Sequence, residues 1–247
     1  MTSASAALIR NEARLYLREP MAWFWVIAFP TLLLIVLGFI PTFREADADL
    51  GGQTVIGLYV SICILLSMVM VGATAMPMTL IEYRSSRILR RLRTTPVSPL
   101  TILGAQAVVF GVSVAIAAAL CLTVGRLAYG APLPQHLLGW LVTFILALAA
   151  MLATGGVITA LTPNASVGNV VSMMVMLPTM FTTGVWFPVQ TMPQTLQTIV
   201  HWTPMGAATE ALNQATMGAF PDALYLLVVA GWTLVLSIVA VRTFRWE

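Results

Sequence analysis

The residues with the strongest recognition chemistry are five arginines in one short segment. Each guanidinium presents fixed donors to a carboxylate or phosphate, so such a group suits an acidic partner surface. The segment predicts a helix from Leu80 to Arg93 that ends before Pro96, with arginines on one face and apolar residues on another. We expect either docking into an acidic-rimmed groove of a soluble protein or a solvated topological anchor. The arginines are Arg84, Arg87, Arg90, Arg91 and Arg93.

The sequence holds few other groups that could carry catalysis. It has no lysine, because all 12 of its Lys and Arg residues are arginine, and a phosphate-binding Walker loop or a Schiff-base enzyme needs lysine. His136 and His201 lie in no metal-binding or hydrolase motif. Cys63 and Cys121 fall inside apolar runs and are expected to be buried thiols. We therefore predict no catalytic, cofactor-binding or metal-binding residues and no enzyme activity on this chain.

The elements that must position these residues are membrane helices. Of the 247 residues, 59% are hydrophobic and 9% are charged, whereas soluble domains average about 25% charged residues. Several uncharged runs are long enough to cross a hydrocarbon core of about 30 Å. The predicted spans are 21–41, 54–78, 97–123, 137–160, 169–187 and 222–242. The sequence thus predicts an all-α membrane protein with six transmembrane helices in a single domain, 1–247.

The distribution of arginine predicts how the chain crosses the membrane. If both termini are cytoplasmic, only Arg44 and Arg126 lie outside, and the other arginines lie on the cytoplasmic side. Arginine-rich short loops remain in the cytoplasm. We therefore expect a multi-pass protein with both termini cytoplasmic.

The first 20 residues predict a cytoplasmic amphipathic helix along the membrane interface. Arg10, Arg14 and Arg18 recur every four residues and form one stripe, while Leu8 and Leu15 lie on another face. This helix either anchors the chain to anionic lipid or contacts a cytoplasmic partner, and the two roles are compatible.

The segment 188–216, before the last span, is apolar but interrupted. Pro188, Pro193 and Pro204 break it, so it predicts two short re-entrant helices at the outer face, 193–201 and 204–216. Irregular backbone at membrane depth must be buried in protein or face water. The segment is either the outer gate of a transport path or a loop that caps the bundle.

Small residues in the third span predict a close helix approach. Gly104 and Gly111 lie among several alanines there. The approach could occur within one chain or between two chains.

Two stretches carry recognisable motifs. The first contains Glu82 followed by Arg90-Arg91-Leu92-Arg93-Thr94-Thr95-Pro96-Val97-Ser98. The second contains Gly184-Val185-Trp186-Phe187-Pro188, Met192-Pro193, Leu196-Gln197, Pro204 and Glu210-Ala211-Leu212. Together they resemble the cytoplasmic and outer motifs of ABC-2-type (type V) ABC exporter permeases, in the branch that exports drugs, antibiotics and lipids. The six spans and the amphipathic start agree, so the resemblance covers nearly the whole chain.

The resemblance implies a complex in the bacterial inner membrane with two permease subunits, identical or homologous, and two ABC ATPase subunits. ATP and Mg would be held by the ATPase, and this chain would hold no cofactor and bind no nucleic acid. Segment 80–95 would be the coupling helix. The residues implied in ATPase coupling are Glu82, Tyr83, Arg84, Arg87, Arg90, Arg91, Arg93, Arg10 and Arg14. The residues implied in an outer gate are Gly184, Phe187, Pro188, Pro193, Pro204 and Glu210.

The nature of the cargo is predicted from the spans. They contain almost no ionisable residue, so a hydrophobic or amphiphilic compound fits better than a strongly charged one. Other branches of the family move polysaccharide precursors or haem-related cargo. Polarisable side chains suit a permissive cavity, although they equally suit ordinary helix packing. The candidate cavity residues are Met68, Met173, Met176, Met180 and Phe181.

Three other functions are weighed against this one. An ion-coupled secondary transporter would need an ionisable group at mid-membrane depth, and the spans offer none. An intramembrane enzyme would need a motif that the sequence lacks. A structural or sensor subunit without transport activity would keep the same motifs, and a transport assay with the ATPase present would distinguish it.

Overall fold

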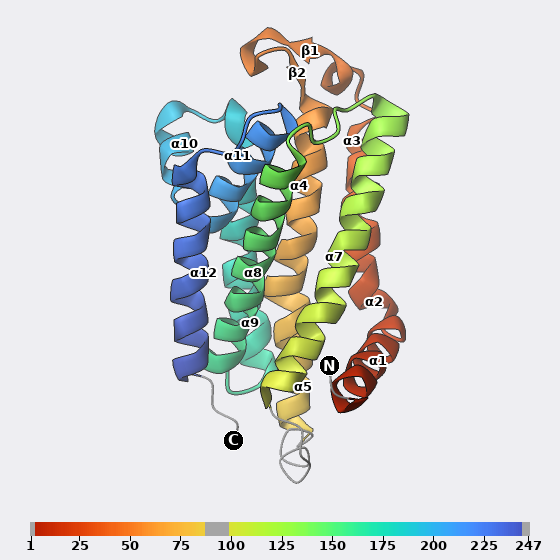
Figure 1. Ribbon diagram of the computed structural model, residues 1–247, viewed down its shortest axis with the longest axis vertical. Coiled ribbons are helices and arrows are strands. Elements are labelled where there is room, and N and C mark those ends of the chain that lie inside the picture. The colour runs from red at the N-terminus through yellow and green to blue at the C-terminus, as the bar shows by residue number, and fades with distance from the viewer. Residues whose placement is uncertain (1–2, 87–98, 244–247) are drawn as a thin grey trace.

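The computed structural model describes residues 3–86 and 99–243 of the chain (Figure 1). Within these residues, six helices are long and apolar enough to cross a membrane. They are Pro20–Leu37 (α2, Pro20–Trp23, with α3, Phe29–Leu37), Val55–Ser85 (α4, Val55–Met70, with α5, Met76–Ser85), Thr101–Tyr129 in α7 (Pro99–Tyr129), α8 (Leu137–Leu161), α9 (Ala165–Thr183) and α12 (Ala223–Thr243). The predicted all-α membrane protein with six spans is confirmed.

The remaining elements lie at the two ends of this bundle. Helix α1 (Ser3–Leu17) lies obliquely at the end where α5 and α12 finish (Figure 1). The opposite end carries two short antiparallel strands, β1 (Ala46–Asp47) and β2 (Gln53–Thr54), and the helices α10 (Gln194–His201) and α11 (Pro204–Thr216). The predicted N-terminal helix and the two predicted short helices before the last span are therefore present, to within three residues at each boundary. The side of the membrane on which each lies stays a prediction.

Helix α4 is the centre of the fold. In the span Val55–Ser85, 89% of an apolar stretch of 18 residues is buried. Helix α4 contacts α3, α7, α8, α9 and α11. Its side chains include Leu65 and Leu66, both fully buried. By contrast, α12 exposes Leu227 and Leu234, as expected of a helix whose outer face meets lipid tails.

Each of the first two spans contains a π-helical turn just before a proline. The turn Phe24–Ala28 precedes Pro30, and the turn Val71–Ala75 precedes Pro77. Proline lacks an N–H and its ring collides with the preceding turn, and a wider turn accommodates this loss. The helical run continues through both prolines, so each span crosses as one helix.

The second span and α8 approach closely at two glycines. A Cβ on Gly72 would lie 2.3 Å from the carbonyl oxygen of Met151, and a Cβ on Gly155 would lie 2.8 Å from the carbonyl oxygen of Gly72. In α7, a Cβ on Gly104 would have no neighbour within 4 Å, and one on Gly111 would make only ordinary contact. Within the chain, the second span therefore approaches α8 closely at Gly72 and Gly155, whereas Gly104 and Gly111 of the third span make no such approach.

Candidate functional site

The end of the bundle that carries α1 holds a partly buried hydrogen bond between distant parts of the chain. The hydroxyl of Tyr83, in α5, donates to Oε2 of Glu12, in α1, over 2.9 Å. Glu12 is only 7% exposed. Burial raises the pKa of Glu12, and the nearby Tyr83 hydroxyl and Gln106 amide partly offset that rise. Tyr83 thus joins α1 to the end of the second span.

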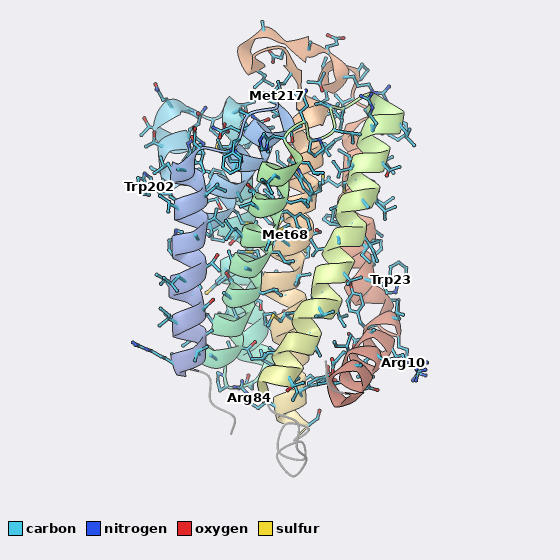
Figure 2. All side chains as sticks on the ribbon, in the orientation of Figure 1. Arg10, Trp23, Met68, Arg84, Trp202 and Met217 are labelled. Atoms are coloured by element: carbon cyan, nitrogen blue, oxygen red, sulfur yellow. The ribbon has the colours of Figure 1, made fainter. Side chains whose placement is uncertain are left out.

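Arg84 points into the protein, toward the last turn of α8. Its guanidinium donates to the carbonyl oxygen of Thr159, over 3.4 Å, and to that of Thr162. Helix α8 ends at Leu161 without a glycine cap, so its last carbonyl groups need other donors, and a cation there also favours the helix dipole. Arg84 therefore caps the end of α8, and it lies at the same end of the bundle as α1 (Figure 2). Its implied role in ATPase coupling stays a prediction.

The other residues implied in coupling fall into two groups. Arg10 and Arg14 are exposed on α1, and Glu82 is exposed in the last turn of α5. Helix α5 continues the second span and ends at Ser85, so the predicted helix start at Leu80 is wrong. Apolar residues continue across that position, and nothing interrupts the helix there. The remaining residues lie outside the described part of the chain: Arg87, Arg90, Arg91 and Arg93.

The outer segment begins where Gly184 ends α9. Gly184 has φ 92°, the left-handed conformation that glycine adopts without strain at helix ends. Pro188 and Pro193 then stand immediately before short helical turns, and Pro204 opens α11, a position where a missing N–H costs nothing. The prolines thus determine where the two short helices begin.

Polar side chains tie this segment together. Nε2 of Gln190 donates to Oε2 of Glu210 over 3.0 Å, and Nε2 of Gln197 donates to the carbonyl oxygens of Gln190 and Met192 over 3.2 and 2.8 Å. The hydroxyl of Thr209 donates to the last turn of α9. Most of α11 is buried, so the segment packs into the bundle.

Two aromatic side chains at this end of the bundle, Trp186 and Phe187, do not pack into it. The side chain of Trp186 is 56% exposed, and that of Phe187 is 64% exposed. Pro188, the next residue, is buried. Of the six residues implied in a gate, Phe187 and Pro193 are exposed, whereas the other four are buried or half-buried.

The candidate cavity residues are not gathered around one space. Met68 is fully buried in the core beside its neighbours on α4, and Met180 is 8% exposed (Figure 2). Phe181 packs against a small cluster of Val189, Met192 and Val200. Met176 is half-buried, whereas Met173 is 55% exposed on α9.

A recess of about 410 Å³ lies elsewhere, between α10 and α12. It is apolar and is lined by Trp202, Leu224, Leu227, Val228, Gly231, Trp232 and Val235. The indole N–H of Trp232 donates to the carbonyl oxygen of Trp202 over 2.8 Å. None of the candidate cavity methionines lines this recess.

Sequence reasoning missed the buried polar face of α1. Glu12 and Tyr16 lie one turn apart and are both buried, while Arg10 and Arg14 are exposed. The four-residue spacing of an acid and a tyrosine on the face opposite the arginines was the available signal. Among the described residues, no group of three or more His, Cys, Asp or Glu side chains could hold a metal ion.

Comparison with known proteins adds the family. A search of curated proteins found no match. The family described as ABC-2 type transporter matches residues 4–217, a range that includes α1, the first five spans and both outer helices. This domain forms the permease component of ABC transporters, and the family implies partnership with an ABC ATPase in a lipid bilayer. The chain belongs to the ABC-2 type transporter family and is a multi-pass membrane permease subunit of an ABC transporter.

Proposed function

We propose that the chain is the permease subunit of an ATP-driven exporter that moves hydrophobic or amphiphilic compounds, such as drugs, antibiotics or lipids, out of a bacterial cell. The observation that carries this proposal is the uncovered face of α9. Only 17% of the 18-residue stretch that would cross the membrane is buried in the protein, and the mean hydropathy of that stretch, 1.4, is the lowest of the six spans. A helix with these two properties is poorly suited to a purely lipid environment.

The contrast with α12 shows why α9 is assigned to the transport path. Helix α12 is also uncovered, with 6% of its window buried, but its mean hydropathy is 2.4, which suits contact with lipid tails. The open face of α9 carries Asn169 and Ser166 together with the exposed Met173 and Met174. Polar and polarisable groups of this kind suit a second permease subunit and an amphiphilic cargo between the two.

The direction of insertion follows from the arginines. Arg10, Arg14, Arg84 and Arg242 belong to elements at one end of the bundle (Figures 1 and 2), and the positive-inside rule makes that end cytoplasmic. We place a separate ABC ATPase there, two copies per complex, binding ATP and Mg. Segment 80–95 and the exposed arginines of α1 are its docking surface.

Purification and transport test the function. The tagged chain is purified from its host in mild detergent, with the expectation of an ABC ATPase in about equal amount. The complex is then reconstituted in vesicles loaded with a hydrophobic fluorescent dye, and ATP, but not a non-hydrolysable analogue, should drive dye movement. Recovery without an ATPase under conditions that preserve other ABC complexes would overturn the proposal.

Cross-linking tests the position of the second permease. Met173→Cys, on α9, should give an oxidised dimer in native membranes, whereas Leu234→Cys, equally exposed on α12, should remain monomeric. The native thiols of Cys63 and Cys121 are buried and do not interfere. Dimers from Leu234→Cys alone would move the subunit contact to α12 and refute the assignment of α9.

A further inference from the structure

A small pocket with polar and apolar walls lies between α1, α5 and α7. Its volume is about 20 Å³, and five of its lining side chains are polar or charged: Tyr16, Glu19, Thr79, Tyr83 and Gln106. Apolar groups, including the ring of Phe110, close it on the side of α7. The ring of Tyr16 meets that of Phe110 edge to face, with centroids 5.6 Å apart. The pocket therefore lies beside the Glu12–Tyr83 hydrogen bond.

Two of the lining side chains have buried polar atoms without a protein partner among the described residues. Gln106 is 2% exposed, and neither its Oε1 nor its Nε2 has a partner in hydrogen-bond geometry, although its amide lies near enough to Glu12 to lower the pKa of that carboxyl. The hydroxyl of Tyr16 is also buried without a hydrogen-bond partner among the described residues. The nearby Ser113 hydroxyl donates instead to the carbonyl oxygen of Val109, over 2.9 Å. Buried polar groups in folded proteins are almost always hydrogen-bonded, to protein or to ordered water.

We propose that this pocket binds one ordered water molecule, which joins Gln106 to Tyr16 and extends the Glu12–Tyr83 hydrogen bond across three helices. The volume suits a single water, which needs roughly 10–15 Å³ of accessible space and about 2–4 polar partners. The amide oxygen of Gln106 accepts a hydrogen bond from the water, and the amide N–H donates a hydrogen bond to it. The Tyr83 hydroxyl, which already donates to Glu12, still has an oxygen lone pair free to accept.

The water site holds α1 against the two helices that border residues 87–98. Tyr16 belongs to α1, Tyr83 to α5 and Gln106 to α7, so a displacement of α1 carries α5 and α7 with it. This consequence for coupling rests on the proposed function, whereas the water site itself and its test do not. Neither an ATPase nor a cargo is needed to detect it.

The test is a double-mutant cycle on the detergent-purified chain, with Gln106→Met and Tyr16→Phe and the thermal unfolding midpoint as the readout. If one water bridges the two groups, each single variant lowers the midpoint by roughly 2–4 °C, and the double variant falls little further because both changes remove the same bridge. Gln194→Met, at an exposed position on α10, is the control and leaves the midpoint unchanged.

If the pocket holds no water, the unfolding midpoint is expected to change in the opposite direction. In a dry pocket, Gln106→Met removes two unsatisfied polar atoms, so the midpoint rises. A rise, an unchanged midpoint or strictly additive losses would each overturn the water bridge. Because the measurement involves only this chain, failure of the water site and failure of the exporter proposal remain distinguishable.

Discussion

Gly72 lies where the second span crosses α8, and replacing it with alanine tests how closely these helices are packed. The added Cβ would lie 2.3 Å from the carbonyl oxygen of Met151 and 2.7 Å from its carbonyl carbon. Both atoms are backbone, so no side-chain rotation can relieve the contact. Ordinary contact begins at 3.4 Å, and the two helices would therefore separate by about 1 Å.

The expected change in the stability of Gly72→Ala is the difference between two opposing effects. Forcing an extra methyl group into a packed interior costs about 1–3 kcal/mol, and a backbone contact belongs at the upper end of that range. Alanine gains about 1 kcal/mol over glycine in a helix. The expected net loss for Gly72→Ala is about 2 kcal/mol, which lowers the unfolding midpoint by roughly 4–8 °C in a chain of this size.

The assay is thermal unfolding in detergent, with Gly104→Ala as the matched control. A Cβ on Gly104 meets nothing within 4 Å, so that variant should keep or slightly raise the wild-type midpoint. Gly72→Ala that is as stable as Gly104→Ala would refute the close packing of the second span on α8.

Four further outcomes are expected. Arg84→Met should lower the unfolding midpoint, because it removes hydrogen bonds to the end of α8 worth about 1.5–3 kcal/mol; an unchanged midpoint with loss of ATPase binding would contradict the capping role. Arg87→Glu with Arg91→Glu should release the ATPase in co-purification while membrane insertion remains normal. Burial raises the pKa of Glu12 above its ordinary value of 4.5. Between these two pKa values the folded chain binds more protons than the unfolded chain, so the stability of the fold falls as the pH rises from about 4.5 through the raised pKa. Glu12→Gln should abolish this fall in a pH series of unfolding midpoints, and persistence of the fall would assign it elsewhere. Glu210→Ala should destabilise the outer segment, measured by protease cleavage of oriented vesicles, whereas Glu210→Gln should not, because glutamine still offers an oxygen to the neighbouring amide.

Much of the fold could be predicted from the sequence, because lipid imposes simple rules. A hydrocarbon core requires long uncharged helices with internal hydrogen bonds, and six such runs are visible in the sequence. Pro193 and Pro204 begin the two outer helices because proline is tolerated before or at a first turn and not within one. The four-residue spacing from Arg10 to Arg14 predicted an exposed face on α1, which the structure has.

The directions of individual side chains depended on tertiary structure. Helical periodicity tells which residues share a face, but it does not tell which neighbour that face meets. The sequence pattern placed Arg84 on a basic face, but it did not show that α8 ends beside this residue with carbonyl groups that need donors. Met68 suited a cavity by its chemistry, yet it lies in the core because α4 is surrounded by other helices.

The buried polar group around Glu12 illustrates the same limit. It is assembled from α1, α5 and α7, whose residues are up to about ninety positions apart in the chain. No local pattern reports that Glu12, Tyr83 and Gln106 meet, because their proximity results from how an interfacial helix packs on two spans. Composition and proline positions determined the number and limits of the helices, and contacts between those helices decided which polar groups are held inside the protein.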